Sequence, residues 1–270
     1  MRIKTKNSEL TPAESRQIAQ ATARDQDGNL CTTLVPVETP LTIRLDNINL
    51  ATLMTIGTHP RELAVGFLRN QLLINRLEEI ESISLDEESE VVSVLTHSKK
   101  PMAAESQTAL GRIVTSGCGQ GSLFNCLMEK VYESPLAGGM IHPPTVFGLL
   151  KNLLNFNEIY RKAGSVHGCA LCRESDVLVY IEDIGRHNAA DIISGKMLID
   201  GTDGNDKIFF TTGRLTSEII IKAAIMRIPI LLSKSGATSM ALELAQELGI
   251  TLVARAKGNR FLIYNEAAPE

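Results

Sequence analysis

The stretch that decides the fold runs from residue 207 to residue 248 and reads KIFFTTGRLTSEIIIKAAIMRIPILLSKSGATSMALELAQEL. Lys207–Thr212 and Ile228–Ser233 are short apolar runs typical of buried strands. Thr216–Met226 and Thr238–Leu248 carry their apolar residues at helical spacing. Strands that alternate with helices in this way predict βα crossovers and a mainly parallel sheet with helices packed on it.

The same alternation continues on both sides of this stretch, and it begins after Pro143. We therefore expect an α/β domain at residues 143–270, preceded at residues 1–142 by a smaller α+β domain that opens with a polar arm. The other expected elements are strands at Leu41–Asn47, Ser82–Leu85 and Val91–Leu95, a helix at Pro60–Leu73, a helix at Thr145–Lys162, strands at Val166–Cys172 and Val177–Glu182, a helix at Asn188–Leu198, and strands at Ile250–Arg255 and Phe261–Tyr264.

The composition is that of an ordinary globular protein, with 44% hydrophobic and 21% charged residues. The 27 basic and 31 acidic residues give a net charge of −4, which argues against a protein that coats nucleic acid or an anionic membrane. Residues 1–10 lack the apolar stretch of a secretory signal, and the most apolar stretch, Ile219–Leu232, is interrupted by charged residues and Pro229. We expect a cytoplasmic protein.

Cys118 is the cysteine that the sequence singles out for chemistry. It lies between glycines in Ser116-Gly117-Cys118-Gly119, ahead of an expected helix at Leu123–Val131. Glycines offer no side chains against which a thiol can pack, and a nearby helix N-terminus favours a thiolate. Taken alone, the pattern fits a reactive thiol and an unreactive one equally well. Cys126 is interpreted as core packing and Cys31 as an incidental thiol, and the odd total of five cysteines suits a reducing compartment.

His167, Cys169 and Cys172 form a pattern that superficially suggests zinc. Strand residues three apart point to opposite faces, and no fourth ligand follows at a suitable spacing. The stretch also lacks the catalytic glutamate and the second cysteine pair of zinc deaminases. We predict no metal site, and interpret His167 either as a core histidine or as a residue that faces the same pocket as His187.

Four loops follow the expected strands at the edge where ligands of such sheets bind, because helix N-termini there attract anions. Each loop contains glycine and at least one cation, and each alone is also explained as a solvated turn with a helix cap. Together they suit a polyanionic ligand such as a nucleotide-bearing cofactor. The cations are Arg186, Arg214, Lys234, Lys257 and Arg260, and the most basic loop is Arg255–Arg260.

Several ordered motifs resemble the formate dehydrogenase accessory sulfurtransferase family, FdhD/NarQ. They are Gly185-Arg186-His187-Asn188, the Thr-Gly-Arg…Ser-Glu…Lys-Ala-Ala run at Thr212–Ala224, Ile228-Pro229-Ile230-Leu231 with Ala237-Thr238-Ser239, Ser116-Gly117-Cys118-Gly119, and the helix motif Glu62–Leu68. The resemblance extends from about Pro40 to Tyr264. It implies a C-terminal domain of cytidine-deaminase-like fold without the zinc site, and a homodimer.

The resemblance also implies a function. Such proteins receive sulfur from a cysteine desulfurase as a cysteine persulfide. They pass it to the molybdenum of a bis-molybdopterin guanine dinucleotide cofactor, which is then inserted into formate dehydrogenase. By position, Cys118 matches the persulfide cysteine. The cofactor-binding segment matches Arg255, Ala256, Lys257, Gly258, Asn259 and Arg260, and His167, Arg186, His187 and Arg214 are expected as secondary contacts.

This sequence departs from the family pattern at two places. Many members have a second cysteine three residues after the first, where this chain has Gly121. Arg255 and Lys257 stand where the family more often has an aromatic or small residue and an arginine. We expect a sulfur carrier, with a cofactor chaperone that transfers no sulfur as the alternative; a nucleoside deaminase is disfavoured because its zinc ligands are absent from the sequence.

Overall fold

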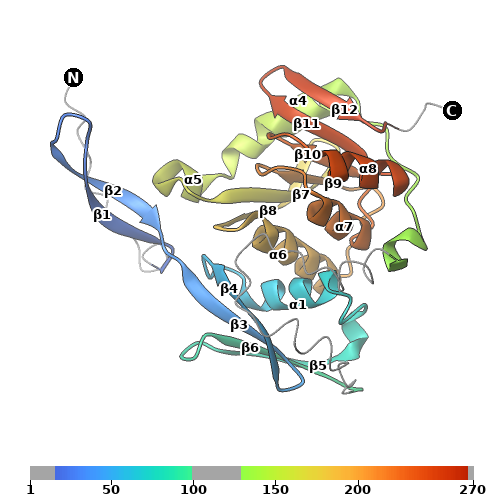
Figure 1. Cartoon of the computed structure of the whole chain (residues 1–270), viewed down its shortest axis with the longest axis horizontal. Helices are drawn as coiled ribbons and strands as arrows, with labels where there is room; N and C mark the ends of the chain where they lie inside the picture. The colour runs from blue at the N-terminus through green and yellow to red at the C-terminus, as the bar shows by residue number, and fades with distance from the viewer. Residues whose placement is uncertain (1–15, 99–128, 267–270) are drawn as a thin grey trace.

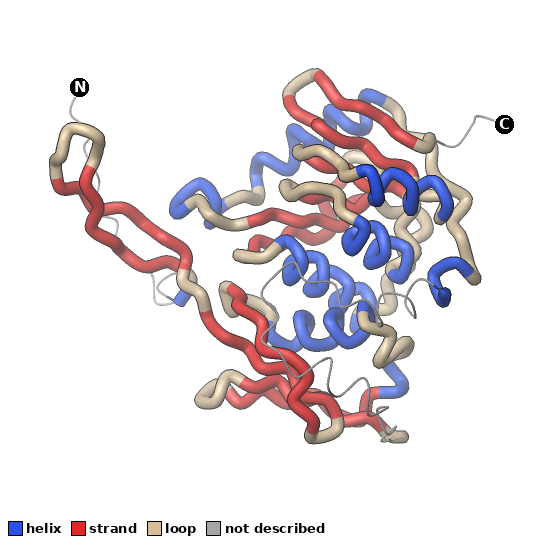
Figure 2. The backbone as a smooth tube through the Cα atoms, in the orientation of Figure 1, coloured by secondary structure: helices blue, strands red, loops and turns tan. Residues whose placement is uncertain are grey.

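The computed structural model describes residues 16–98 and 129–266, which form a mixed α/β fold (Figures 1 and 2). Three sheets are present in these residues: a two-stranded sheet, a four-stranded sheet and a six-stranded sheet. None of the helices in this part of the chain is both long and apolar enough to cross a lipid bilayer.

The polar arm contains a β-hairpin that the sequence pattern did not predict. β1 (Ile18–Arg24) pairs antiparallel with β2 (Leu30–Pro36), and the hairpin projects away from the body of the molecule (Figure 1). Most of its side chains are at least partly exposed. Neither face therefore has to be apolar, and the alternation of apolar and polar residues that identifies a half-buried strand is missing.

The four-stranded sheet has the order β4-β3-β6-β5 and carries one long helix, α1 (Pro60–Asn70). The strands expected near residues 41, 82 and 91 are present, and β5 and β6 pair antiparallel around an exposed acidic turn. One further strand, β4, follows β3 as a hairpin. The bounds are β3 (Thr39–Leu45), β4 (Ile48–Thr55), β5 (Ile80–Asp86) and β6 (Val91–Thr96), with a 3-10 turn, η2, at Leu77–Glu79.

The six-stranded sheet has the order β12-β11-β10-β9-β7-β8, and it is mixed rather than mainly parallel. Only the β9–β10 and β10–β11 pairs are parallel, because β7 runs antiparallel between β8 and β9 and β12 runs antiparallel to β11. Strands β8 to β11 nevertheless share one direction, so their carboxyl ends meet at one edge. The bounds are β7 (His167–Arg173), β8 (Asp176–Asp183), β9 (Ile208–Thr211), β10 (Ile230–Ser233), β11 (Thr251–Lys257) and β12 (Arg260–Tyr264).

Helices cover both faces of this sheet (Figure 1). α4 packs on one face, where its buried residues join a cluster that includes Cys172. α6, α7 and α8 pack on the other, in a cluster that includes Cys169. The two cysteines therefore lie on opposite faces, as expected for strand residues three apart. The helices are α4 (Pro143–Asn152), α6 (Arg186–Ile199), α7 (Ser217–Ile225) and α8 (Ser239–Glu247).

The prediction of a single helix at residues 145–162 is wrong, because the structure has two separate helices there. α4 ends at Asn152, a 3-10 turn η3 occupies Leu153–Asn155, and α5 spans Glu158–Ala163. Asn157 interrupts the helix with a ψ of 61°. Asparagine competes for backbone hydrogen bonds in non-helical conformations, which favours a break here.

α1 joins the two halves of the molecule by crossing α6 at very short range. A Cβ atom on Gly66 would lie 1.7 Å from the backbone oxygen of Asp191, and one on Gly195 would lie 1.9 Å from that of Glu62. Only glycine permits this approach. The buried residues of α1, α6 and both larger sheets form one continuous cluster, and the domain boundary near residue 143 stays a prediction.

Candidate functional site

A cavity of about 830 Å³ lies at the edge of the six-stranded sheet where β8 to β11 end. Residues from the start of β7, the ends of β9 and β10, and the β11–β12 turn form one side of it, and α4, η3 and α5 contribute the other. The lining residues are Phe147, Leu150, Lys151, Leu154, Asn157, Tyr160, Val166, His167, Gly168, Tyr180, Thr212, Lys234, Ala256, Lys257, Gly258 and Asn259.

The cavity brings six of the predicted site residues together: His167, Lys234, Ala256, Lys257, Gly258 and Asn259. The remaining predicted residues of the described chain, Arg255, Arg260, Arg186, His187 and Arg214, do not line it.

The expected basic loop at Arg255–Arg260 is largely strand. Residues up to Lys257 belong to β11, Arg260 belongs to β12, and Lys257 pairs with Arg260 across the hairpin. Gly258 and Asn259 alone form the turn, and the φ of +60° at Gly258 suits glycine. Arg255 has a φ of +54° at a register shift in the ladder, and its N–H donates to the backbone oxygen of Ser235. The hairpin is therefore longer than predicted.

The charged side chains of the described cavity wall are all positive. Lys151, Lys234 and Lys257 line it, and no Asp or Glu does so among the residues described. The Lys234 ammonium lies 5.8 Å from the centre of the Phe210 ring, and burial lowers its pKa. Burial, followed by the charge of Arg186, lowers the pKa of His167, so this imidazole is neutral at pH 7. The wall suits an anionic ligand.

Aromatic rings form a second feature of the cavity. Phe147, Tyr160 and Tyr180 line it, and Phe156 stacks on Tyr180 with ring centres 5.8 Å apart. Rings beside lysines suit a ligand that has both a planar group and negative charge. The sequence patterns did not indicate these residues, because the sheet-edge rule concerns loops after strands, whereas Phe147 and Tyr160 come from helices.

Asn188, the last residue of the Gly185-Arg186-His187-Asn188 motif, has a structural role. Asn188 Nδ2 donates to the Met54 backbone oxygen at 2.7 Å and to Asp183 Oδ1 at 2.9 Å. The other carboxylate oxygen of Asp183 accepts from the Thr55 hydroxyl and from the Ile56 N–H. Burial raises the pKa of Asp183. The motif thus fastens the start of α6 to the end of β4.

His187 is a buried residue and not a wall of the cavity. Burial, and then the charge of Lys222, lower its pKa to about 3. Glu218 Oε1 lies 3.3 Å from its Nδ1. Lys222 forms an ion pair with Asp191 at 2.7 Å, and both side chains are almost fully buried. This network links α6 to α7, so His187 is neutral and structural.

The three described cysteines lie outside the cavity. Cys31 is exposed on the β1–β2 hairpin, whereas burial raises the pKa of Cys169 and of Cys172 to about 12. Such thiols are poor nucleophiles. Cys118 and Cys126 fall outside the described residues. In the part of the chain that is described, no three His, Cys, Asp or Glu side chains gather as a metal site would require.

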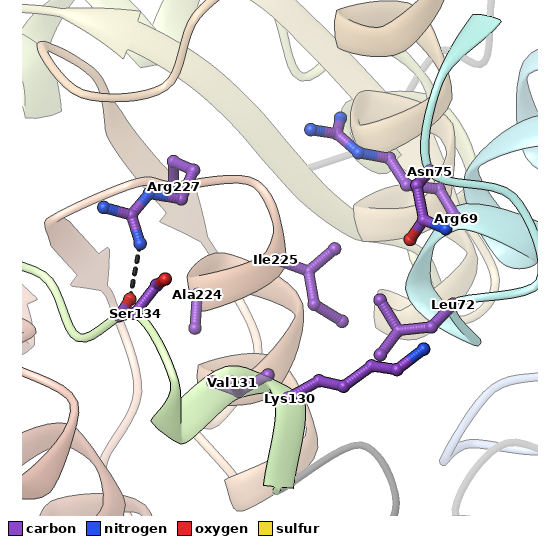
Figure 3. A pocket seen from close by; sticks show the side chains of 9 residues that line it. All are labelled: Arg69, Leu72, Asn75, Lys130, Val131, Ser134, Ala224, Ile225 and Arg227. Atoms are coloured by element: carbon purple, nitrogen blue, oxygen red, sulfur yellow. Dashed lines mark hydrogen bonds between the residues drawn. The ribbon is translucent and has the colours of Figure 1, made fainter.

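A second, smaller cavity of about 200 Å³ lies between α1, α7 and residues 130–134 (Figure 3). It contains none of the predicted site residues. Arg69 donates to the Ser194 backbone oxygen at 2.9 Å and Arg227 to that of Ser134, so two of its three cations already bind the protein itself. Its lining residues are Arg69, Leu72, Asn75, Lys130, Val131, Ser134, Ala224, Ile225 and Arg227.

The comparisons with known proteins agree with one another. The model of the FdhD/NarQ family matches residues 36–269. The chain is 32% identical over 229 residues to the sulfur carrier protein FdhD of Bacillus subtilis (strain 168), covering 84% of this chain and 86% of that protein. It is 30% identical over 251 residues to the protein of the same name from Staphylococcus aureus (strain MRSA252), covering 92% and 94%.

A solved structure is also similar. The crystal structure of a protein described as a formate dehydrogenase accessory protein, from Desulfotalea psychrophila, superposes with a TM-score of 0.71 at 27% identity. The match covers 92% of this chain and 96% of that one. Sequence and structure therefore place this chain in the FdhD/NarQ family.

Proposed function

We propose that this protein is a sulfur carrier for formate dehydrogenase. It would accept sulfane sulfur from a cysteine desulfurase on Cys118 and deliver it to the molybdenum of a bis-molybdopterin guanine dinucleotide cofactor. The names of the relatives support the sulfur-carrier role. The observation that supports binding of the cofactor is the cavity. Lysines and aromatic rings line it, and its described wall contains no acidic residue.

The cofactor is the substrate of this protein, and its nucleotide portion fits the cavity chemically. Lys234 and Lys257 would bind phosphate oxygens, and the Gly258 turn lets backbone approach them. Tyr160, Tyr180 and Phe147 would contact the flat base. Ala256 and Asn259 complete this wall, and the sheet with helices on both faces suits the cytidine-deaminase-like arrangement that we propose for this half.

The loading step is a thiol–persulfide exchange. The Cys118 thiolate attacks the terminal sulfur of the donor persulfide, a new S–S bond forms on Cys118, and the donor cysteine leaves as a thiolate. No net oxidation or reduction occurs in this step. One cysteine is sufficient for it, so Gly121 in place of a second cysteine does not prevent loading.

The test combines loading with binding. The protein is incubated with a cysteine desulfurase and cysteine, and mass spectrometry should show a gain of about 32 Da, one sulfur atom, that is lost on reduction and absent from Cys118→Ala. Isothermal titration with GDP should show binding. Binding without any loading would instead identify a cofactor chaperone, and loading without binding would remove the cavity from the proposal.

Size-exclusion chromatography with light scattering tests the proposed homodimer.

A further inference from the structure

Arg186 and Arg214, two of the cations that the sequence predicts as cofactor contacts, form a cationic pair beside the cavity without lining it. Arg186 begins α6, directly after β8, and Arg214 lies in the turn between β9 and α7. The Arg186 side chain lies against Gly213, the residue before Arg214, and burial, followed by the positive charge of Arg214, lowers the pKa of Arg186. Holding like charges together is unfavourable unless an anion joins them.

The surroundings of the pair leave its positive charge largely unbalanced. Arg186 Nε is buried and has no hydrogen-bond partner in the described part of the chain. Glu218 is the acid whose charge acts on Arg186, but its carboxylate lies 3.3 Å from the His187 ring and 3.8 Å from Lys222 Nζ. A buried donor without a partner is costly, and a ligand that accepts from it removes that cost.

The backbone around the pair is shaped to hold Arg186 in place. A Cβ atom on Gly213 would lie 2.6 Å from Cδ and 3.3 Å from Cβ of Arg186, so the arginine side chain lies across the glycine. The Cys169 thiol donates weakly to the Arg186 backbone oxygen at 3.7 Å. Thr212, the residue before Gly213, lines the cavity, and its hydroxyl lies 3.4 Å from Nδ1 of the cavity residue His167. The pair is therefore adjacent to the cavity without lining it.

We propose that Arg186 and Arg214 form an anion-binding subsite next to the cavity, for a compact anion that can accept from both guanidinium groups. The identity of that anion rests on the proposed function. It is either the diphosphate of the molybdenum cofactor or the anionic terminal sulfur of the Cys118 persulfide. Both are compact groups that accept charge-assisted hydrogen bonds. His187 contributes no charge to the subsite.

The first experiment tests the subsite independently of the cargo, using inorganic phosphate as the probe. Phosphate should raise the melting temperature of the wild-type protein in a concentration-dependent way at constant ionic strength. Arg186→Met with Arg214→Met should reduce this shift, and any shift that remains is assigned to the cavity lysines Lys234 and Lys257. Gly213→Ala should do the same, because it displaces the Arg186 side chain while retaining its charge. Gly236→Ala is the matched control, since a Cβ there meets no atom within 4 Å and the residue occupies the neighbouring turn.

The second experiment identifies the anion. If it is the diphosphate, the Arg186/Arg214 double variant should bind GDP about tenfold more weakly while its affinity for guanosine stays unchanged. If it is the persulfide, GDP affinity should stay unchanged and alkylation of the loaded Cys118 persulfide should slow as pH falls, with a midpoint higher in the double variant than in the wild type. Either result supports the subsite.

Two outcomes overturn the inference. An equal phosphate shift in the wild type, the double variant and Gly213→Ala would show that the pair binds no anion. Equal GDP binding together with an equal alkylation profile would show that it binds neither candidate. A wild type that binds phosphate through the pair but neither binds GDP nor takes up sulfur would refute the proposed function instead, and leave the subsite standing.

Discussion

Asn188, in the first turn of α6, donates a hydrogen bond to the backbone oxygen of Met54 at the end of β4, across 2.7 Å. The same amide donates to Asp183, so one side chain joins the end of β8 and the start of α6 to β4, which is distant in the sequence. Asn188→Ala leaves two buried acceptors with fewer donors, and we expect it to lower the free energy of unfolding by about 1–3 kcal/mol. Urea denaturation measures this.

The control for Asn188 is Asn205→Ala, which removes an exposed amide whose partner is Asp203. Exposed substitutions of this kind change stability by about 0.5 kcal/mol or less. An equal effect of the two variants would show that the Asn188 contacts do not stabilise the fold.

Gly66→Ala should strongly destabilise the protein, because its new methyl group would collide with the Asp191 backbone at the α1–α6 crossing. Forcing backbones apart costs about 1–3 kcal/mol, and more when they cannot shift. Gly236→Ala, which adds the same atom in open space, should leave stability almost unchanged. Thermal unfolding compares the two variants, and equal melting temperatures would show that the helices tolerate wider spacing.

His187 should make stability depend on pH. Its pKa is about 3 in the folded protein and about 6.5 when unfolded, so the unfolded state binds a proton first as pH falls. Its contribution is therefore complete above pH 6.5 and is lost progressively between pH 6.5 and about 3. At pH 5 the loss is about 2 kcal/mol.

His187→Gln removes this titration, and its unfolding free energy should fall less steeply between pH 7 and pH 5 than that of the wild type. Urea titrations at both pH values give the two slopes. His97→Gln, at an exposed position, serves as the control and should retain the wild-type slope. Identical slopes in all three proteins would assign the pH dependence to other groups.

Cys118 should be the cysteine whose loss abolishes sulfur transfer. Burial raises the pKa of Cys169 and Cys172 to about 12, which keeps both thiols protonated near neutral pH. Cys118→Ala should therefore fold normally and gain no persulfide, whereas Cys169→Ala and Cys172→Ala should still load. Mass spectrometry after treatment with a desulfurase decides the matter: loading of Cys118→Ala, with none in Cys169→Ala, would move the reactive thiol to β7.

Sulfur loading and nucleotide binding should be separable. Lys234→Met with Lys257→Met removes two cations from the cavity wall, and GDP affinity should fall at least about tenfold because each charge-assisted contact contributes about 1.5–3 kcal/mol. Persulfide loading by the desulfurase should be unchanged. Arg260→Met is the comparison, since Arg260 does not line the cavity, and it should bind GDP more tightly than the double variant. Loss of loading along with binding in a folded double variant would mean that the two functions share one site.

Apart from the helix at residues 145–162, which the structure divides, the sequence predicted the elements of the C-terminal half, because their strands and helices are buried deeply enough to impose clear apolar periods. It did not predict the β1–β2 hairpin, whose side chains are mostly exposed, or the position of β7 between β8 and β9. Periodicity describes which faces of a strand are buried, but the neighbour of a strand depends on contacts distant in the sequence.

The candidate site could be predicted in part, for a physical reason. His167, Lys234 and Lys257 follow or begin strands at one sheet edge, so the topology gathers them. Tyr160 comes from α5, a separate short helix that begins after Asn157 and that the sequence pattern did not distinguish from α4. Tertiary packing also decides how deeply Arg186 and His187 are buried. It leaves His187 neutral beside the charged Arg186, a difference that the sequence pattern does not show.

The position of β7 inside the six-stranded sheet means that the two walls of the cavity are held by different numbers of neighbouring strands. β7 is paired on both sides, by β8 and by β9, so the wall that carries His167 is held by two ladders. The wall that carries Lys257 is the tip of the β11–β12 hairpin, and β12 lies at the end of the six-stranded sheet. A ligand slightly longer or shorter than the natural one would therefore be accommodated by bending of the hairpin, and substitutions at Gly258 should broaden or narrow the range of ligand sizes without disturbing the His167 side.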